Sequence, residues 1–457
     1  MIRKSLFTLF LAFSFSGFAQ ITSTISSWLQ NTTQLGTYYV SGNSTAMSNN
    51  ILANCQKVEY STNNVYVTAT GVPSYPTGPF LDFNPSNAQN QNSIFQFPLN
   101  PTPNFGSPIS TNGGNIGVFI NGVAVFDYRD GVAWNPNTNS LCGGPGNPPC
   151  PGGPMASMDW NRDAIPAEMN GFDCSKGHPA MGNYHHHQNP SAFKIDLTVL
   201  SNICNLYDAD GLYTPDSNSH SPLIGFAYDG YPIYGAFGYK NADGSGGITR
   251  IKSSYHLRNI TTRTNGPTVG QVITITGPGG TSQETLFLGY FKEDYEYIIN
   301  VGDDHLDEHN GRFAITPDYP NGTYAYYATV DEDWNSTYPY LIGPTFYGNA
   351  SNRKVNSINE TTTIYTSSIG NIELKDSDIS VFPNPTSDLI AIQFNGIVMN
   401  DIKVELLDQM GRLIQLKKIS KGSTIAYFDT QSVYQGVYIL RLTSNNNEIT
   451  RKIQIVK

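Results

Sequence analysis

Charged side chains are scarce in this chain of 457 residues. They make up 14% of the sequence, whereas an average soluble protein has about 25%. So few charges exclude a coiled coil and a large helical bundle, whose surfaces are rich in them. The 26 Lys and Arg are outnumbered by 36 Asp and Glu and form no cluster. A nucleic-acid partner is therefore excluded, because phosphate binding needs a basic face.

Long apolar runs are also missing beyond the N-terminus. No later segment approaches the roughly 20 apolar residues of a spanning helix, so we expect no transmembrane span. The first residues do carry an export pattern: Arg3 and Lys4 are basic, residues 5–18 are mainly apolar, and residues 17–19 form a small-x-small cleavage site. We therefore expect a signal peptide at 1–19 and an exported mature protein.

Cysteine is sparse, and all five cysteines lie beyond the signal, where export permits disulfides. Cys142 and Cys150 bracket a loop rich in glycine and proline, and we expect them to pair. Cys174 and Cys204 are the second expected pair. Cys55 is then the thiol left over.

Glycine, proline and aromatic residues are abundant, with 43 Gly, 28 Pro, 28 Tyr and 23 Phe. This composition favours strands and turns. Strand-like runs of β-branched and aromatic residues occupy 65–70, 116–125, 223–228, 271–276, 285–288, 295–301, 313–316 and 323–329. Residues 135–155 favour a long loop, fastened by the first disulfide. The sequence predicts an all-β fold with few short helices, in which residues 20–350 form a large β-rich body.

A second, smaller unit is indicated at the C-terminus. Residues 351–378 offer little apolar surface to bury and are interpreted as a linker. Residues 379–457 carry a formal charge of +3, against −13 for the rest of the chain. They contain seven short strand-like runs, at 379–382, 389–394, 402–407, 413–419, 424–429, 436–443 and 448–456, which predict a small β-sandwich.

Four segments of this unit carry a resemblance to a known family. They are VFPNPT at 381–386, VELLDQMGR at 404–412, GVYILRL at 436–442 and RKIQIVK at 451–457. In this order they resemble the type A C-terminal sorting domain of the type IX secretion system, with Pro383, Asn384, Pro385, Gly411, Gly436 and Tyr438 as sorting-signal residues. The resemblance implies secretion machinery as partner, export across a Gram-negative outer membrane, and a cargo that is released or attached to the surface. An ordinary adhesive β-sandwich with a similar turn is the alternative.

Histidines are concentrated in one short segment. Four of the eight lie between residues 178 and 187. If the chain after Gly182 is a strand, His185 and His187 point to one face and His186 to the other. His178, across a Pro/Gly turn, can fold back to supply a third nitrogen, which is the ligand count of an open zinc or copper site. The alternative is a set of hydrogen-bonded histidines in a Tyr-rich sheet.

A second resemblance surrounds these histidines. The segments NGVAVFD at 121–127, DG at 130–131, GHP at 177–179, YHHH at 184–187, SPLIGFAYDGYPIYG at 221–235 and LDEHNGR at 306–312 resemble the YHYH-domain family. The family is named for a Tyr-His-Tyr-His motif, and here Tyr184 is followed by three histidines, so that His186 stands at the third position. This departure keeps the alternating pair His185 and His187. The family has no established reaction that the resemblance could imply.

Several other ionisable residues are candidates for the same site. Asp229 lies beside a glycine turn among tyrosines and is a candidate acid or base, although Asp-Gly is also a favoured turn. Glu308 is the second candidate, and Tyr184, Asp307 and Arg312 are further site candidates. The alternative for Asp307, Glu308 and Arg312 is an internal ion pair. Residues 305–309 fit the His-x-x-Glu-His pattern of inverted zincins, but that motif needs a helix, and a turn is expected here. Residues 207–211 lack most of a calcium loop.

Three classes of function follow from these patterns. The first is an exported metal-binding protein that holds zinc or copper through His178, His185 and His187, acting on an extracellular polymer or small molecule if it is an enzyme. It requires the three ring nitrogens to lie within about 4 Å of a common point. The second is a carbohydrate or polymer binder that uses exposed tyrosine rings, motivated by Tyr184, Tyr228, Tyr231, Tyr234, Tyr326, Tyr327, Tyr338 and Tyr340. The third is a structural or adhesion protein with a hydrogen-bonded polar core.

Overall fold

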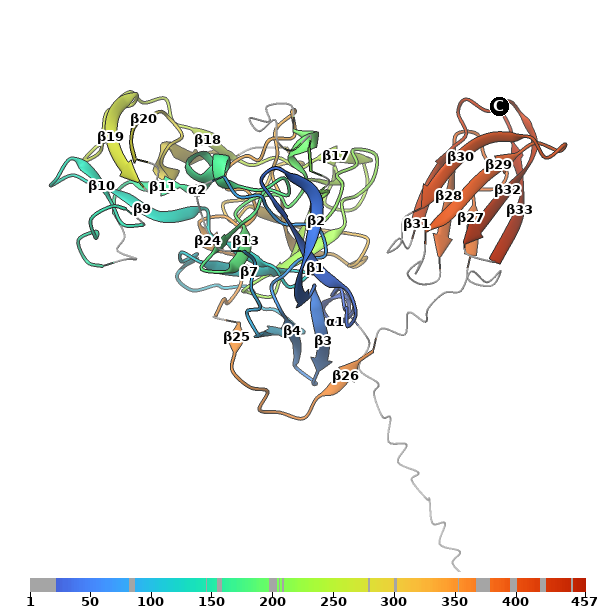
Figure 1. Ribbon diagram of the computed structural model, residues 1–457, viewed down its shortest axis with the longest axis horizontal. Coiled ribbons are helices and arrows are strands. Elements are labelled where there is room, and N and C mark those ends of the chain that lie inside the picture. The colour runs from blue at the N-terminus through green and yellow to red at the C-terminus, as the bar shows by residue number, and fades with distance from the viewer. Residues whose placement is uncertain are drawn as a thin grey trace, which may run out of the picture. The chain divides into compact units, whose positions relative to one another are not determined.

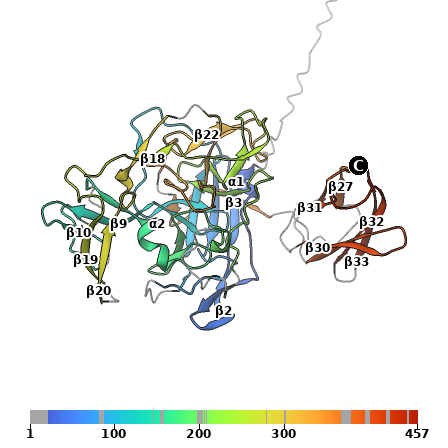
Figure 2. The same cartoon turned by 90° about the horizontal axis from the view of Figure 1, so that it is seen from above.

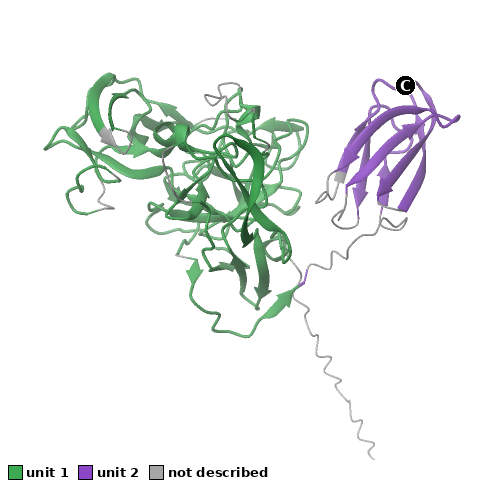
Figure 3. Cartoon of the chain, viewed as in Figure 1, with its two compact units in different colours: residues 1–365 green, residues 366–457 purple. Residues whose placement is uncertain are grey.

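The computed structural model describes residues 22–457, apart from 82–86, 145, 154–157, 197–203, 205, 208, 278–279, 300–301, 352, 367–378, 395–400, 420–424 and 445–446. The expected signal peptide lies outside the described residues, as does the segment 367–378 of the expected linker. The chain divides into two compact units, residues 1–365 and 366–457 (Figure 3). Each unit is built mainly from strands, which confirms the all-β prediction.

An eight-stranded mixed sheet forms the centre of the first unit. Its order is β12-β13-β8-β7-β14-β15-β23-β22, and the β13–β8 and β15–β23 pairs are parallel. The strands are β7 (Asn115–Phe119), β8 (Ala124–Phe126), β12 (His178–Ala180), β13 (Asn183–His186), β14 (Leu223–Ala227), β15 (Pro232–Tyr234), β22 (Gly311–Ala314) and β23 (Thr323–Tyr327). The strands β12 and β22 are therefore the two edges of this sheet.

A five-stranded antiparallel sheet packs against the central sheet. Its order is β25-β5-β4-β3-β26. The strands are β3 (Cys55–Tyr60), β4 (Asn64–Ala69), β5 (Ser93–Pro98), β25 (Lys354–Val355) and β26 (Thr363–Tyr365). Phe97 of β5 and Phe226 of β14 lie in the same buried core, with ring centroids 6.0 Å apart, and Trp28 packs against both rings. The main core is thus formed between these two sheets.

The boundary between the units differs from the expected one. Residues 351–378 were expected to be a linker, yet β25 pairs with β5 and β26 pairs with β3. Both are edge strands, which need backbone hydrogen bonds but bury few side chains; Ile364 of β26, for example, is exposed. A polar composition is therefore compatible with strand pairing, and the first unit extends to Tyr365.

One predicted strand is a hairpin. Residues 116–125 were expected to form a single strand, but the chain turns between β7 and β8 at Asn121 and Gly122. Gly122 has a φ of +79°, and its amide donates to the Phe119 carbonyl, while the Asn121 side chain accepts the Val123 amide. An Asn-Gly pair is a strong hairpin signal, so the turn was readable from the sequence.

Short helices and two-stranded ribbons surround the two large sheets. The described helices are α1 (Ser23–Ser26), α2 (Ala164–Glu168) and the 3-10 turns η1 (Met169–Gly171), η2 (Phe193–Ile195) and η4 (Lys292–Asp294). The two-stranded pairs are β1 (Leu35–Val40) with β2 (Asn43–Leu52), β6 (Ile109–Ser110) with β24 (Thr345–Phe346), β16 (Phe237–Tyr239) with β17 (Ile248–Arg250), β18 (Tyr255–Leu257) with β21 (Tyr295–Tyr297), and β19 (Gln271–Gly277) with β20 (Gly280–Leu286).

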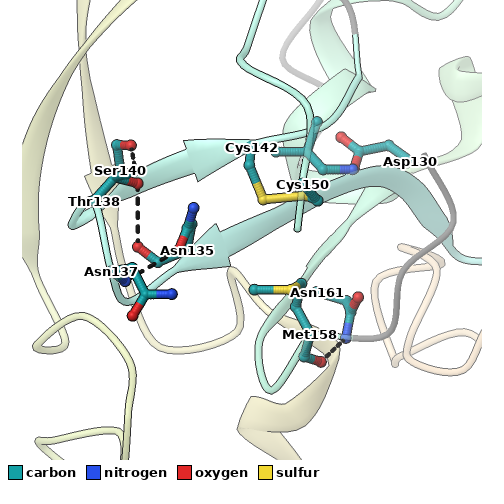
Figure 4. Close-up of a disulfide and its surroundings, with 10 residues drawn as sticks. Asp130, Asn135, Asn137, Thr138, Ser140, Cys142, Cys150, Met158 and Asn161 are labelled. Atoms are coloured by element: carbon teal, nitrogen blue, oxygen red, sulfur yellow. Dashed lines mark hydrogen bonds between the residues drawn. A yellow bond between two sulfur atoms is a disulfide. The ribbon is translucent and has the colours of Figure 1, made fainter. Parts of the chain in front are cut away.

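A three-stranded sheet lies at one end of the first unit, beside the β19–β20 hairpin (Figures 1 and 2). It consists of β9 (Arg129–Asn135), β10 (Ser140–Cys142) and β11 (Asn161–Asp163), with β9 in the middle. Residues 135–155 were expected to be a long loop, but β10 returns to pair with β9. The expected Cys142–Cys150 disulfide then fastens the following loop to β10 (Figure 4).

The second expected disulfide is also present, between Cys174 and Cys204. Cys55 keeps a free thiol, buried in the main core, and burial raises its pKa above the ordinary value. All three cysteine predictions are therefore confirmed.

The second unit has the expected seven strands in two sheets, ordered β27-β28-β31 and β30-β29-β32-β33. The strands are β27 (Ile379–Phe382), β28 (Leu389–Phe394), β29 (Ile402–Leu407), β30 (Leu413–Ile419), β31 (Ile425–Asp429), β32 (Gly436–Ser444) and β33 (Asn447–Ile455). Side chains of both sheets share one buried core, including Ile392 of β28 and Leu440 of β32. This arrangement is the predicted β-sandwich.

Candidate metal centre

A short hairpin at one edge of the central sheet brings the histidines together. The strands β12 and β13 pair antiparallel, with His178 directly opposite His185. The turn between them uses Met181 and Gly182, both at positive φ. Glycine takes this conformation readily and methionine rarely, so the tight turn is held by the strand pairing around it. Alternation along β13 then sends the side chains of His185 and His186 to opposite faces.

Three imidazoles converge on one point. The candidate ligand atoms of His178, His185 and His187 all lie within 4.8 Å of one another, and the Nε2 atoms of His185 and His187 are 3.1 Å apart. Such a triangle places each nitrogen within about 3 Å of a common centre, inside the limit of about 4 Å required above. The three residues are 7%, 1% and 3% exposed, respectively.

The backbone fixes the orientation of two of these rings. The Nδ1–H of His185 donates to the carbonyl of Asn183 at 2.9 Å, and the Nδ1–H of His187 donates to the carbonyl of Asp127 at 2.5 Å. A carbonyl oxygen can only accept, so each Nδ1 carries the proton and each neutral ring presents a lone pair at Nε2. Two lone pairs therefore face each other, and a cation between them would satisfy both.

Protonation of His185 at Nε2 would remove the repulsion between the two lone pairs, but it is unfavourable. Burial, together with the nearby imidazoles of His178 and His187, holds the pKa of His185 well below its ordinary value. The ring of Phe126 stacks on His185 with centroids 3.6 Å apart, and Phe172 meets His178 edge to face. These apolar walls make a proton on His185 costly and strengthen any interaction with a bound cation.

A carboxylate completes the cluster. Glu168, the last residue of α2, places Oε2 3.2 Å from Nε2 of His178 and 3.3 Å from Nε2 of His187. This oxygen is buried but makes no hydrogen bond of good geometry. Burial raises the pKa of Glu168, but His178 and His187 in their protonated forms donate to this carboxylate and outweigh burial, so that the pKa of Glu168 lies well below its ordinary value. An ionised oxygen thus faces the same point as the histidine nitrogens.

Glu168 was not among the candidates from sequence. Helix α2 spans five residues, too few for helical periodicity to show. The available signal was local: the Asp163 side chain caps the helix by accepting the Ile165 amide, and Pro166 lies in its first turn.

The opposite face of β13 is a closed hydrogen-bonded network. His186 donates from Nδ1 to the Lys176 carbonyl at 3.0 Å and accepts at Nε2 from the Tyr75 hydroxyl at 2.7 Å. Burial lowers the pKa of His186 to about 3. Tyr184, a site candidate from sequence, also lies on this face and donates to the buried carboxyl of Asp173. Both nitrogens of His186 are therefore satisfied, and Tyr184 lies behind the site.

The loop that leads to His178 is anchored at several points. Cys174 is joined to Cys204, and the buried Lys176 pairs with Asp196 at 2.7 Å. Asp173 accepts backbone amides from Ser175 and Gly177. The position of His178 is therefore set by covalent and ionic contacts before any ligand binds.

Asp229 lies elsewhere in the sheet. It follows β14, which β7 and β8 separate from β13. Its carboxylate accepts from the Tyr326 hydroxyl at 2.5 Å and from the Gly348 and Tyr231 amides, and burial raises its pKa. These contacts hold a turn against β23.

The acidic segment before β22 lies at the other edge of the sheet from β12. Asp307 accepts from the Tyr324 hydroxyl, Glu308 has an exposed carboxylate 3.9 Å from His309, and Arg312 donates to the carbonyls of Lys240 and Tyr239. Residues 302–310 contain no helix, in agreement with the rejection of the zincin motif. The structure does not bring Glu308, Asp307 or Arg312 to the histidine cluster.

A cleft of about 450 Å³ lies next to the histidine hairpin. It is lined by residues from β6, β7, β24, β25 and the start of β13, among them Asn115, Asn183 and Tyr228. The Asn183 side chain donates to Asn115 at 3.3 Å, and its carbonyl is the one that orients His185. The cleft and the candidate metal centre thus share Asn183.

The sequence of the first unit matches a known family. The model of the family described as YHYH protein matches residues 94–339, more than half of the chain. The chain belongs to the YHYH protein family. The matched region contains all three histidines, Glu168 and the central sheet. The family resemblance identified from the sequence is thereby confirmed.

The second unit matches the family described as secretion system C-terminal sorting domain, over residues 380–456. This YHYH protein is therefore exported by the type IX route, to be secreted or attached to the cell surface. In the helices of the described part, no stretch is both long and apolar enough to cross a membrane.

Six residues of this unit were expected from the sequence resemblance to form a sorting signal. Asn384, between Pro383 and Pro385, donates to the Lys452 carbonyl and accepts the Gln454 amide, which ties the motif to β33. The others lie at turns or strand starts: Gly411 at φ +78° between β29 and β30, and Gly436 and Tyr438 at the start of β32.

One curated protein shares a shorter likeness. An endo-acting ulvan lyase of Formosa agariphila is 31% identical over 120 residues, which are 26% of this chain and 23% of the lyase. The chain spans less than a quarter of the length of that relative. The likeness is too short to assign its activity to the YHYH protein.

Proposed function

We propose that this exported YHYH protein binds a divalent metal ion, zinc or copper, through Nε2 of His185 and His187 and a ring nitrogen of His178. The observation that carries the proposal is the 3.1 Å separation of two Nε2 atoms whose Nδ1 partners are both carbonyls. Tetrahedral zinc with bonds of about 2 Å places neighbouring nitrogens about 3.3 Å apart. A bound metal ion would replace the repulsion between the Nε2 lone pairs of His185 and His187 with two metal–nitrogen bonds.

Glu168 supports a site with an open fourth position. Three histidines and one nearby carboxylate match the nitrogen and oxygen donors that zinc and copper accept. A bound divalent ion would supply Lewis acidity at that position. Glu168, with Oε2 already facing the histidines, would either complete the ligand set or accept a proton from a molecule held there.

The test is elemental analysis of the purified full-length chain beside a His185→Ala/His187→Ala variant. We expect about one equivalent of zinc or copper in the wild type, and none in the variant. The matched control is His256→Ala/His305→Ala, which removes two histidines outside the cluster and should keep the metal. Absence of metal from the wild type after loading and dialysis would refute the proposal.

A folding defect could mimic loss of the site, so a milder variant is needed. His178→Gln keeps a polar side chain of similar reach and should still lose most of the metal. Zinc should also stabilise the wild type against unfolding, by about 2.7 kcal/mol at a hundredfold excess over Kd, and leave the double variant unchanged. Equal stabilisation of both proteins would show binding at another site.

Polymer binding through exposed tyrosine rings loses its original support. The eight tyrosines that motivated it are all buried: Tyr184, Tyr228, Tyr231, Tyr234, Tyr326, Tyr327, Tyr338 and Tyr340. Their rings pack in the core instead of forming an exposed groove. Any polymer binding must therefore use a different surface.

A further inference from the structure

The cleft beside the histidines has the size of a small-ligand site. Its volume of about 450 Å³ lies within the range of about 300–1,000 Å³ that such sites occupy. Twelve residues line it: Ile109, Ser110, Asn112, Gly113, Asn115, Ile116, Asn183, Tyr228, Phe346, Ala350, Ser351 and Lys354. They come from separate parts of the chain that the central sheet and its neighbours bring together.

The lining chemistry is mostly uncharged and polar. Three asparagine amides and two serine hydroxyls can each donate and accept hydrogen bonds, while only Lys354 is charged. The partly exposed side chains of Ile109 and Ala350 add apolar surface, whereas the rings of Tyr228 and Phe346 are buried. A ligand that suits this lining carries many hydroxyl groups and some apolar C–H faces, as a sugar chain does.

Two residues of the cleft lining, Asn183 and Asn115, lie on the same face of the central sheet as the candidate metal centre. Asn183 and His185 are two residues apart on β13, so their side chains are about 7 Å apart on one face. Asn115 of β7 is directly opposite Phe126 of β8, whose ring stacks on His185. A chain-like ligand in the cleft would therefore extend along the sheet toward the histidines.

We propose that this cleft binds a glycan segment and presents it to the metal centre; the second half of the proposal rests on the proposed metal site. The sugar hydroxyls are held by the amides of Asn112, Asn115 and Asn183, and the C–H groups of the sugar pack on Ile109 and Ala350. Asn183 connects the two sites, because its side chain lines the cleft and its carbonyl orients His185.

Binding is tested by affinity electrophoresis of the full chain in gels that contain laminarin, xylan, alginate or ulvan. The first two polysaccharides are neutral and the last two anionic. We expect at least one to retard the wild type. Asn115→Leu removes the central amide, and Ser110→Trp fills the cleft from an exposed rim position; each should weaken retardation at least tenfold. Asn63→Leu, at an exposed turn outside the cleft, is the matched control and should bind as the wild type does.

The outcomes separate the glycan proposal from the metal proposal. His185→Ala/His187→Ala should still be retarded, and both cleft variants should keep the metal content of the wild type. Retardation by none of the four polysaccharides, or retardation that survives both cleft variants, overturns the glycan proposal and leaves the metal site standing. Presentation to the metal is read from the visible spectrum of the cobalt-loaded protein. The retarding polysaccharide should shift the spectrum in the wild type and not in Ser110→Trp, and an unshifted wild-type spectrum overturns presentation.

Discussion

The two faces of β13 use the same side chain in opposite ways. On one face, His186 has a hydrogen-bond partner at each ring nitrogen, the Lys176 carbonyl and the Tyr75 hydroxyl. On the other face, His185 and His187 have carbonyl partners only at Nδ1, and their Nε2 atoms face each other. Burial is the same on both faces, so it does not set the proposed ligands apart from His186. What differs is the partner of the second ring nitrogen.

The largest effect is expected for His187→Ala. This change removes one of three nitrogens and the ring whose Nε2 faces His185, so zinc affinity should fall at least a thousandfold, or about 4 kcal/mol. Competition with a chromophoric chelator measures the Kd. A change in Kd of less than threefold would contradict the contrast drawn between the two faces of β13.

On the other face, His186→Ala should lower the free energy of unfolding and leave the metal content unchanged. The change leaves a cavity and strips the Tyr75 hydroxyl and the Lys176 carbonyl of their partner, which together should cost about 2–4 kcal/mol. Urea denaturation of metal-free protein gives the free energy of unfolding, and elemental analysis gives the stoichiometry. Loss of metal from a folded His186→Ala protein would contradict the division of roles.

The variant Glu168→Gln tests whether the carboxylate contributes to the proposed metal site. The amide keeps the shape of the side chain but removes the negative charge near His178 and His187, so we expect zinc to bind 10–100-fold more weakly. The same chelator competition measures the effect. Gln96→Ala, in a strand of the other sheet, should leave the Kd unchanged, and an unchanged Kd in Glu168→Gln would remove the carboxylate from the site.

The two carboxyl groups at the ends of helix α2, the N-cap Asp163 and the last residue Glu168, differ in the same way in their hydrogen-bond partners. Oε2 of Glu168 lacks a good hydrogen bond, whereas the Asp163 carboxylate accepts from the Tyr340 hydroxyl and the Ile165 amide. Burial raises the pKa of Asp163 from 3.8 to about 8. The folded state therefore holds this proton more tightly than the unfolded state, and its contribution to stability is lost as pH rises between these values.

The smallest effect is expected for Asp163→Asn, which removes this titration but keeps a capping side chain. Between pH 5 and 8, the free energy of unfolding of the metal-free wild type should fall more steeply than that of the variant, by at most about 1.4 kcal/mol per pH unit. The buried Asp173, with a pKa raised to about 7, leaves some slope in both proteins. Parallel curves from urea titrations would show that Asp163 is ionised throughout.

The convergence of His178, His185 and His187 was predictable from the sequence because its geometry is local. Period-two alternation separates His185 and His187 from His186, and one turn brings His178 back beside His185. The Cys142–Cys150 disulfide and the strands of the sorting domain were likewise predicted from neighbouring residues, whereas Cys174 and Cys204 lie 30 residues apart and were only the second candidate pair. Glu168 was missed because its place depends on a five-residue helix and on long-range packing.

The remaining differences also have physical reasons. The edge strands β25 and β26 have polar sequences because they bury few side chains, so composition alone indicates a linker. The distance of Asp229 and Glu308 from the histidines depends on the order of the strands in the central sheet. Hydrophobic patterns in the sequence do not specify that order.

The scarcity of charge noted in the sequence has a structural counterpart. Several carboxyl groups are partnered by tyrosine hydroxyls instead of Lys or Arg: the buried ones in the pairs Asp163–Tyr340, Asp173–Tyr184 and Asp229–Tyr326, and less buried ones in the pairs Asp307–Tyr324 and Asp318–Tyr234. A tyrosine donates a hydrogen bond and adds apolar surface to the core. The abundance of tyrosine is therefore explained by packing of the interior.

The Cys174–Cys204 disulfide determines when the loop before His178 gains its covalent anchor. Cytosolic thiols are kept reduced, so the loop that leads to His178 gains its covalent anchor only after the chain has left the cytoplasm. The site would then reach its final geometry in a compartment with a different supply of metals from the one in which the chain is made. The ion that occupies it would be selected by where the protein matures as well as by the affinity of its ligands.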